Sequence, residues 1–225
     1  DPTRLRPLEA RDLALYRHLV AQVGRLKITV APELVPPPQI IALVQAGVTV
    51  ALGHSDADAF TARAAFAAGA ATATHLFNAM SGLDHRAPGL AAAALRHGTF
   101  GIIADGIHIH PDMLRLALTH AKGAYLVSDA MAVAGTQAHE FFLDGRRITR
   151  RDRRLTLADG TLAGADLTLA RAVEVVHGAG LSRAQAVAMA TMAPRALLGL
   201  PVTLQDGDAA LFQVWPAEGP HSLRA

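Results

Sequence analysis

The repeated pairing of a short apolar run with a helical segment constrains the fold of this chain more than any other feature. Each run has the length and residue content of a buried strand, and polar or ionisable residues follow its last apolar position. Segments with a helical spacing of apolar residues separate the runs. Strands that alternate with helices indicate right-handed βαβ units and a parallel sheet. The five runs are residues 27–30, 48–52, 71–74, 101–104 and 124–127.

The order of these units predicts an α/β fold, namely a (β/α)-barrel of the TIM type. Barrels of this type place their functional groups at the carboxyl ends of several strands, so the residues that follow the runs should meet at one mouth. A doubly wound open sheet has a similar alternation, but it usually carries a glycine-rich phosphate turn, which this sequence lacks. The residues that follow the runs are Glu33, His54, His75, His108 and Asp129.

A complete barrel of this type has about eight strands, whereas the sequence supplies five such runs. We therefore expect a partial barrel made of strands 4 to 8, with the remaining strands on its N-terminal side. Residues 1–200 are predicted to form the barrel domain, and residues 201–225 a remnant of a small β domain. After the fifth run we expect hairpins at 141–148 and 155–162, helices at 167–177 and 182–198, and a last strand at 211–215.

Composition limits the kind of metal site that the chain can build. Of its 225 residues, 51% are hydrophobic, which is enough for one sizeable core. The sequence has no cysteine, which excludes disulfides and thiolate metal sites. Any metal must therefore be held by His, Asp or Glu.

Charge and hydropathy give weak expectations about partners and location. The formal net charge is only +2, and the one cluster of arginines lacks interleaved aromatic residues, so we interpret it as a solvated turn and expect no nucleic-acid partner. No apolar run reaches the ~20 residues that span a bilayer, and the first residues do not resemble a signal peptide. We expect no membrane contact and a cytoplasmic location. The cluster consists of Arg146, Arg147, Arg150, Arg151, Arg153 and Arg154.

Two histidines at successive strand ends are the strongest indication of chemistry. Alone, His54 or His75 would more often be a structural histidine, but their pairing, with Asp129 at a later strand end, favours a metal site. Imidazole nitrogens suit Zn²⁺ or Fe²⁺, and the sequence leaves open whether one or two ions bind. An aspartate beside a metal-bound water can act as general base and then as general acid.

Two further features admit either a functional or a structural interpretation. His108 and His110 could form a second metal site, but a histidine at a barrel mouth can equally bind an anion. Arg86 lies in a loop rich in Gly and Pro and could bind a phosphate or carboxylate through two hydrogen bonds, although a loop arginine is usually solvated.

Six short motifs together resemble the N-acetylglucosamine-6-phosphate deacetylases of the amidohydrolase superfamily. They keep the order and approximate spacing of that family over most of the chain, and Thr-His-Leu-Phe-Asn-Ala-Met is the most specific of them. The motifs are Thr29-Val-Ala-Pro-Glu33, Gly53-His-Ser55, Thr74-His-Leu-Phe-Asn-Ala-Met80, Ile103-Ala-Asp-Gly-Ile-His108, Leu126-Val-Ser-Asp-Ala-Met131 and Leu162-Ala-Gly164.

The resemblance implies an amidohydrolase barrel and a role for each matching residue. His54 and His75 are implied to be metal ligands, and Asp129 the catalytic acid and base. The implied substrate is a phosphorylated amino sugar, which loses its acetyl group. In this family, the arginine that corresponds to Arg86 reaches across from the other subunit of a homodimer. The implied substrate-binding residues are Asn78, Ala79, Arg86 and His108, together with Leu162, Ala163 and Gly164 of the sugar pocket.

The sequence departs from the family pattern at three places. The family's glutamate ligand belongs to a His-x-Glu-Gly-Pro run before Thr29, and this run does not occur here, nor does a substrate-contacting histidine just after it. Glu33 could be proposed as a substitute ligand. In the family, however, this Ala-Pro-Glu position is not the metal glutamate, so we favour a role in the pocket or behind the ligands. The usual Arg-Glu-Pro-Gly reads Arg86-Ala-Pro-Gly89, and His110-Pro111 stands where other residues are common.

Two alternatives to the deacetylase remain open at this point. One is another amidohydrolase that acts on a different N-acyl sugar or on a cyclic amide, which the change at Ala87 would allow. The other is a non-catalytic remnant, because two histidines and one aspartate make a poor closed metal site and a partial barrel exposes sheet edges.

Overall fold

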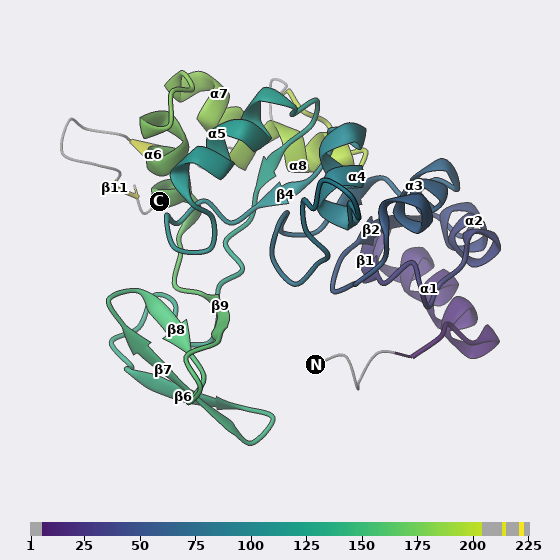
Figure 1. The fold of residues 1–225 in the computed structure, drawn as a ribbon, viewed down its shortest axis with the longest axis horizontal. Coiled ribbons are helices and arrows are strands. Elements are labelled where there is room, and N and C mark those ends of the chain that lie inside the picture. The colour runs from purple at the N-terminus through teal and green to yellow at the C-terminus, as the bar shows by residue number, and fades with distance from the viewer. Residues whose placement is uncertain (1–5, 204–212, 215–220, 223–225) are drawn as a thin grey trace.

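A computed structural model describes residues 6–203, 213–214 and 221–222 of the chain. Its main body is an α/β unit in which short parallel strands alternate with helices (Figure 1). The predicted 211–215 strand is described only at β10 (Gln213–Val214), which pairs antiparallel with β11 (His221–Ser222). The rest of that strand and most of the predicted domain at 201–225 lie outside the described residues.

All five predicted strands form, and neighbours in the chain are neighbours in space. β1, β2 and β3 make one parallel sheet and β4 and β5 another, and a parallel bridge from Ala73 to Phe100 joins the two. The register sets Val30 beside Leu52 and Leu52 beside Ala73, so the carboxyl ends of these strands lie side by side. The strands are β1 (Leu26–Val30), β2 (Val48–Leu52), β3 (Thr72–Ala73), β4 (Gly101–Ile102) and β5 (Tyr125–Leu126).

Helices precede or connect these strands, and local signals fix where they begin. Asp58 caps α3 by accepting a hydrogen bond from the Thr61 backbone N–H at 2.7 Å. Proline stands in the first turn of α2 and of α5, where its missing N–H costs nothing. The helices are α1 (Ala10–Val23), α2 (Pro37–Gln45), α3 (Ala59–Ala67), α4 (Leu90–His97) and α5 (Pro111–Thr119).

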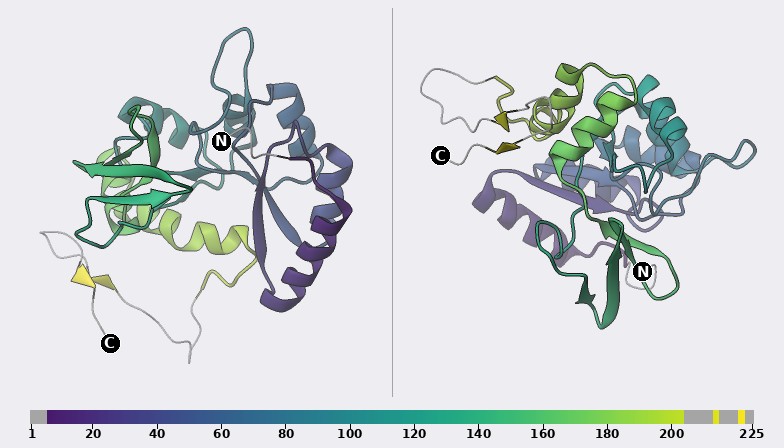
Figure 2. Two further views of the ribbon diagram at one scale, coloured as in Figure 1. Left: turned by 90° about the horizontal axis from the view of Figure 1, so that it is seen from below. Right: turned by 90° about the vertical axis from the view of Figure 1, so that its left-hand side faces the viewer.

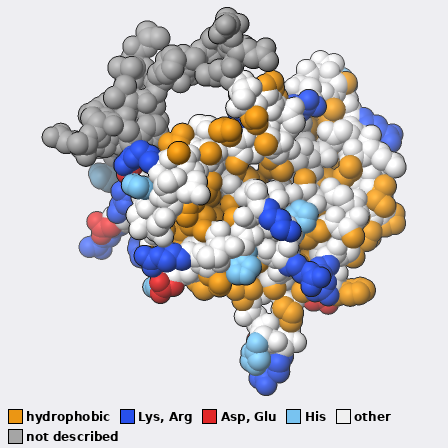
Figure 3. Space-filling view, turned by 90° about the horizontal axis from the view of Figure 1, so that it is seen from above, with side chains coloured by type: hydrophobic (Ala, Val, Ile, Leu, Met, Phe, Trp, Pro, Cys, Tyr) orange, Lys and Arg blue, Asp and Glu red, His pale blue; other side chains and the backbone are white. Residues whose placement is uncertain are grey.

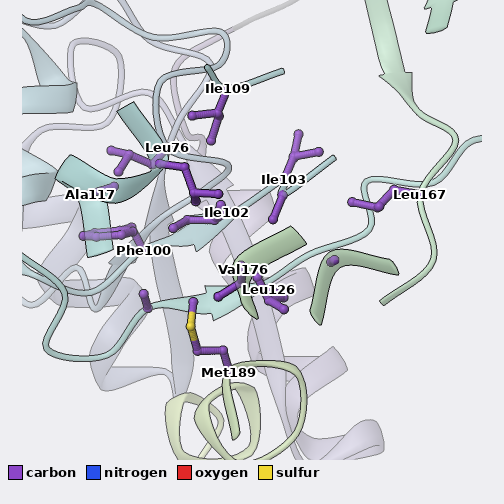
Figure 4. Packing of buried hydrophobic residues seen from close by; sticks show 14 of the residues in the cluster. Leu76, Phe100, Ile102, Ile103, Ile109, Ala117, Leu126, Leu167, Val176 and Met189 are labelled. Carbon is purple, nitrogen blue, oxygen red and sulfur yellow. The ribbon is translucent and has the colours of Figure 1, made fainter. Parts of the chain in front are cut away.

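The larger hydrophobic core lies between β4, β5 and the later helices. Phe100, Ile102 and Leu126 from the strand region meet Val176 of α6 (Leu169–Gly178) and Met189 of α7 (Arg183–Ala190), as Figure 4 shows. Full burial of such a side chain contributes about 1.5–3 kcal/mol. The strand ends are therefore held by a well-packed body rather than by loops.

The predicted helix at 182–198 is wrong as one element, because it breaks at Thr191. α7 ends at Ala190, and α8 (Met192–Leu197) begins after Thr191, whose φ is −127°. Pro194 cannot donate a backbone hydrogen bond, and its ring would clash with the carbonyl of residue 190 in a continuous helix. The chain therefore turns before the proline.

A small antiparallel sheet stands apart from the main body (Figures 1 and 2). We call it the small sheet. Ile148 and Leu155 are buried within it and pack with Val133. The predicted hairpin at 141–148 is confirmed, with its turn at Asp144-Gly145. Its strands are β6 (Glu140–Leu143), β7 (Arg146–Arg151), β8 (Arg154–Thr156) and β9 (Leu162–Ala165).

The arginine cluster lies on β7, β8 and the turn between them, and it is not uniformly solvated. The Arg150 side chain, only 15% exposed, donates to the carbonyls of Val133 and Thr136 at 2.9 and 2.8 Å. The interpretation of the cluster as a solvated turn is therefore wrong for Arg150, which ties the 133–136 loop to the sheet. On the face shown in Figure 3, Lys and Arg side chains lie in separate spots. Within the described ranges, no helix is long and apolar enough to cross a bilayer.

Candidate active site

The close approach of β2 and β3 brings the two predicted metal ligands together. Gly53 follows β2, and a Cβ atom added to it would lie 2.9 Å from Cβ of Thr74. Only glycine allows this approach. The next residues along the two segments are His54 and His75, and their Nε2 atoms lie 2.9 Å apart.

Backbone strain is concentrated at the strand ends. His54, His75, Ala79 and Asp129 have φ values of +51°, +30°, +47° and +48°, in a region that residues with a Cβ rarely occupy. Each such conformation costs of order 1–3 kcal/mol and persists only where the surroundings enforce it. The strain therefore marks the mouth of the strands as a site whose side-chain directions are held at a cost in stability.

Glu33 connects three loops around the histidines. Its carboxylate accepts hydrogen bonds from the Ser55 hydroxyl at 2.5 Å and from the Asp56 backbone N–H at 3.0 Å. The Ser55 backbone N–H donates to the carbonyl of Ala79 at 3.1 Å. The carboxylate of Glu33 is thus engaged with the loop that carries His54, which agrees with a supporting role behind the ligands.

The residues present fit part of a metal site. His75 is buried, at 6% exposure, and its Nδ1 atom has no hydrogen-bond partner in the described structure. Burial and the neighbouring charge of His75 lower the pKa of His54, which favours the neutral imidazole that binds metals. Among the residues that the structure describes, no group of three or more His, Asp or Glu side chains is placed to hold an ion. The two histidines therefore fit as two ligands of a larger set.

One cavity of about 630 Å³ collects nearly all of the predicted site residues. It is lined by His54, His75, Asn78, Ala79, His108, Asp129, Leu162, Ala163 and Gly164. Arg86 does not line this cavity: it lies in an exposed loop, where its backbone N–H donates to Asp84 at 2.8 Å. The geometry of one chain therefore brings together every predicted site residue except this arginine.

A buried hydrogen bond to Asp105 orients His108. Its Nδ1 atom lies 2.7 Å from Asp105 Oδ2, and the two side chains are 6% and 5% exposed. Burial raises the pKa of Asp105, but hydrogen bonds from the His108 side chain and from the backbone N–H groups of His108 and Ile107 outweigh it, and the pKa is lowered overall. With Nδ1 engaged, Nε2 is the ring nitrogen left to meet a ligand in the cavity.

The small sheet joins the loop of the predicted catalytic acid through its last strand. The Ala165 backbone N–H donates to the Asp129 carbonyl at 2.9 Å, and the Met131 N–H donates to the Ala165 carbonyl at 3.2 Å. A Cβ atom on Gly164 would lie 2.4 Å from Cγ of Met131, so the two segments pack as closely as glycine allows. The 162–164 motif therefore reaches the cavity because β9 pairs with this loop.

Several lining residues were missed by reasoning from the sequence. Two of them, Arg146 and Ile148, lie two residues apart on β7, so alternation along the strand places them on one face. That this face turns toward the site follows from the pairing of β9 with the Asp129 loop, which the sequence does not reveal. The missed residues are Ile103, Met131, Leu143, Arg146, Ile148, Leu157 and Thr161.

Comparison with known proteins identifies relatives over nearly the whole chain. The chain is 42% identical over 216 residues to an N-acetylgalactosamine-6-phosphate deacetylase of Shewanella sp. (strain ANA-3), and the alignment covers 93% of this chain and 53% of that protein. It is 38% identical over 166 residues to the N-acetylglucosamine-6-phosphate deacetylase of Bacillus subtilis (strain 168), covering 70% and 42%. No protein-family model matches the chain.

Solved structures give the same result. The crystal structure of N-acetylglucosamine-6-phosphate deacetylase from Pasteurella multocida superimposes with a TM-score of 0.88 at 30% identity, covering 95% of this chain and 58% of that one. The chain spans about half the length of the curated relatives that it matches. The resemblance predicted from the motifs is confirmed, and we conclude that this chain is related, over nearly all of its length, to the N-acetylglucosamine- and N-acetylgalactosamine-6-phosphate deacetylases.

Proposed function

We propose that the protein to which this chain belongs hydrolyses N-acetylglucosamine 6-phosphate to glucosamine 6-phosphate and acetate, in amino-sugar catabolism. The observation that carries the proposal is the convergence of His54, His75 and Asp129 on one cavity. The names of the relatives support it, because they describe the removal of an acetyl group from an amino-sugar phosphate.

His54 and His75 would hold a divalent metal, Zn²⁺ or Fe²⁺ by ligand type, as one or two ions. When bound, such a metal would polarise the acetamide carbonyl and would lower the pKa of water toward ~7. The Nε2 atoms of the two histidines lie 2.9 Å apart, which supports the proposal that both bind the same metal ion. A complete site would need further ligands, from other side chains or from water.

Asp129 is proposed to move the proton in both halves of the reaction. Its carboxylate takes a proton from the attacking water as the new C–O bond forms at the acetamide carbon. It then returns this proton to the amide nitrogen as the C–N bond breaks, so that the amine and acetate leave. Its exposed side chain lines the cavity beside the histidines, and its strained φ of +48° fixes where the carboxylate points.

The remaining lining residues are proposed to bind the sugar phosphate. Asn78 and Ala79 would meet the acetamide end beside the histidines, and Leu162-Ala-Gly164 the sugar ring. His108 would contact the phosphate through Nε2. Arg86 lies in an exposed loop and does not line the cavity of its own chain, which supports a role in a homodimer, where it would serve the partner's site.

The assignment of the strands completes the proposal. We assign β1 to β5 to strands 4 to 8 of an amidohydrolase barrel, with residues 1–200 as barrel domain and 201–225 as part of a small β domain. Parallel pairing in chain order from β1 to β5 supports this assignment. We also propose a cytoplasmic location, where phosphorylated sugars are metabolised.

The galacto epimer is a second candidate substrate. The Shewanella relative, 42% identical over 216 residues, is an N-acetylgalactosamine-6-phosphate deacetylase. The two substrates differ at one hydroxyl, and a pocket discriminates strongly only where it hydrogen-bonds that group.

Acetate release from the full-length protein tests the proposal. With added Zn²⁺, Fe²⁺ or Co²⁺ we expect acetate from N-acetylglucosamine 6-phosphate, N-acetylgalactosamine 6-phosphate or both, and a fall in kcat of at least about 100-fold in Asp129→Asn. Asp152→Asn, which alters an exposed carboxylate in the turn between β7 and β8, is the matched control. Full activity in Asp129→Asn would refute the role of Asp129 as general base and acid. No acetate from either sugar would refute the proposed reaction.

A further inference from the structure

We propose that Arg146, at the start of β7 in the small sheet, binds the substrate phosphate within the same chain and makes the site selective for phosphorylated sugars. This inference rests on the proposed function for its substrate. The juxtaposition that carries it is that Arg146 and His108, from different parts of the fold, line one cavity together with Asp129.

Strand alternation directs Arg146 into the cavity and its neighbour away from it. Successive side chains of a strand point to opposite faces. Arg146 and Ile148 both line the cavity, whereas Arg147, between them, forms an ion pair with Glu140 across the hairpin. Arg146 therefore lies on the inner face of the small sheet.

Charge within the cavity singles out this residue. Of the described side chains that line it, Arg146 is the only one with a permanent positive charge, and Asp129 is the only carboxylate. A sugar phosphate carries close to two negative charges at neutral pH, and its usual partner is a guanidinium, which can donate two parallel hydrogen bonds. Arg86, the arginine expected from the motifs, does not line the cavity of its own chain.

Arg146 is exposed at the start of β7. None of the ion pairs found among the described residues includes it. The carboxylate that feels its charge is Asp159, whose pKa is lowered mainly by hydrogen bonds from Thr161, with a smaller contribution from Arg146. Asp159 is already engaged by the Thr161 backbone N–H at 2.9 Å.

The strand that carries Arg146 is fixed relative to the catalytic acid. β7 pairs with β8 and β8 with β9, and β9 is hydrogen-bonded to the Asp129 loop. Arg150, on the same face as Arg146, holds the 133–136 loop through two backbone carbonyls. The backbone that carries Arg146 is therefore held in place before an anion binds. Binding then has to order the side chain but not the strand, which lowers its entropic cost.

Two glutamine variants of the full-length protein separate this role from a general effect of charge. Arg146→Gln removes the proposed phosphate ligand, and Arg147→Gln removes an equal charge from the opposite face of the same strand. Isothermal titration with glucosamine 6-phosphate and with inorganic phosphate measures binding directly. We expect Arg146→Gln to weaken the binding of both by about 10- to 100-fold, as for the loss of a charged hydrogen-bond pair. Arg147→Gln should bind as the unaltered protein does.

Kinetics with and without the phosphate give a second readout. Arg146→Gln should lower kcat/KM for N-acetylglucosamine 6-phosphate by a similar factor and leave kcat/KM for N-acetylglucosamine unchanged, while Arg146→Lys should restore part of the loss. Equal binding of glucosamine 6-phosphate by the two glutamine variants would overturn the inference. If the unaltered protein binds glucosamine 6-phosphate through Arg146 but releases no acetate from either sugar, the proposed reaction fails and the phosphate site stands.

Discussion

The Nε2 atoms of His54 and His75 lie 2.9 Å apart, with the two rings nearly perpendicular at 74°. Two imidazole lone pairs at this distance repel each other unless a proton or a cation lies between them. The pair is therefore stable as a hydrogen bond in which one imidazole donates to the other, or, as proposed, with both rings bound to one metal ion.

Loss of either histidine should weaken metal binding more than it weakens the fold. We expect His75→Ala to lower the affinity for Zn²⁺ by at least about 100-fold, measured by competition with a chromophoric chelator. His97→Ala, a histidine that stacks on Phe66 away from the cavity, is the control. Equal zinc affinity in the two variants would show that the pair is structural.

Glu33 should act on metal binding through the loop that it holds. Glu33→Gln keeps one acceptor but loses the charge that receives the Ser55 and Asp56 hydrogen bonds, and we expect zinc affinity to fall by about 10-fold. The free energy of unfolding should fall by about 1–2 kcal/mol. Glu140→Gln, which breaks an exposed ion pair with Arg147, should change neither quantity; a similar loss of zinc affinity there would contradict the role of Glu33.

Asp105 should make stability depend on acid pH. Because its pKa is lowered in the folded protein, the unfolded chain binds the proton first as pH falls. The stabilisation is present above the ordinary pKa of about 3.9 and is lost as pH falls through the folded value. Urea unfolding from pH 7 to pH 3 should show a decline that is smaller in Asp105→Asn, and an identical decline would contradict the assignment.

Gly164 should tolerate no side chain. Gly164→Ala places a Cβ atom 2.4 Å from Met131 Cγ at a φ of +72°, and we expect loss of acetate release together with a fall in melting temperature. Gly160→Ala has a similar φ of +84° but no atom within 4 Å, so it isolates the backbone cost of about 1 kcal/mol. If the two variants behaved alike, the close contact with Met131 would have no role of its own.

The strand ends could be predicted because their signals are local. The alternation of apolar runs with helices, and the polar residue after each run, correctly indicated where His54, His75 and Asp129 would lie. The break at Thr191 was also encoded locally, in Pro194, but the apolar spacing across it suggested one helix.

The inner face of the small sheet could not be predicted, because its placement depends on a contact between distant segments. Arg146 lies within a run of arginines that, taken by itself, is typical of a solvated turn. Only the hydrogen bonds between Ala165 and the Asp129 loop direct that part of the run toward the cavity. Arg86 shows the opposite case, since its motif is recognisable but the residue lies outside the cavity of its own chain.

The backbone hydrogen bonds between Ala165 and the Asp129 loop couple the position of the small sheet to that of the proposed catalytic acid. A ligand bound to Arg146 of β7 would therefore also act, through β8 and β9, on the residue proposed to transfer the proton. Binding energy from the phosphate could thereby align the acetamide with Asp129, in addition to holding the substrate in the site. A sugar without its phosphate would then be turned over more slowly even when it saturates the site.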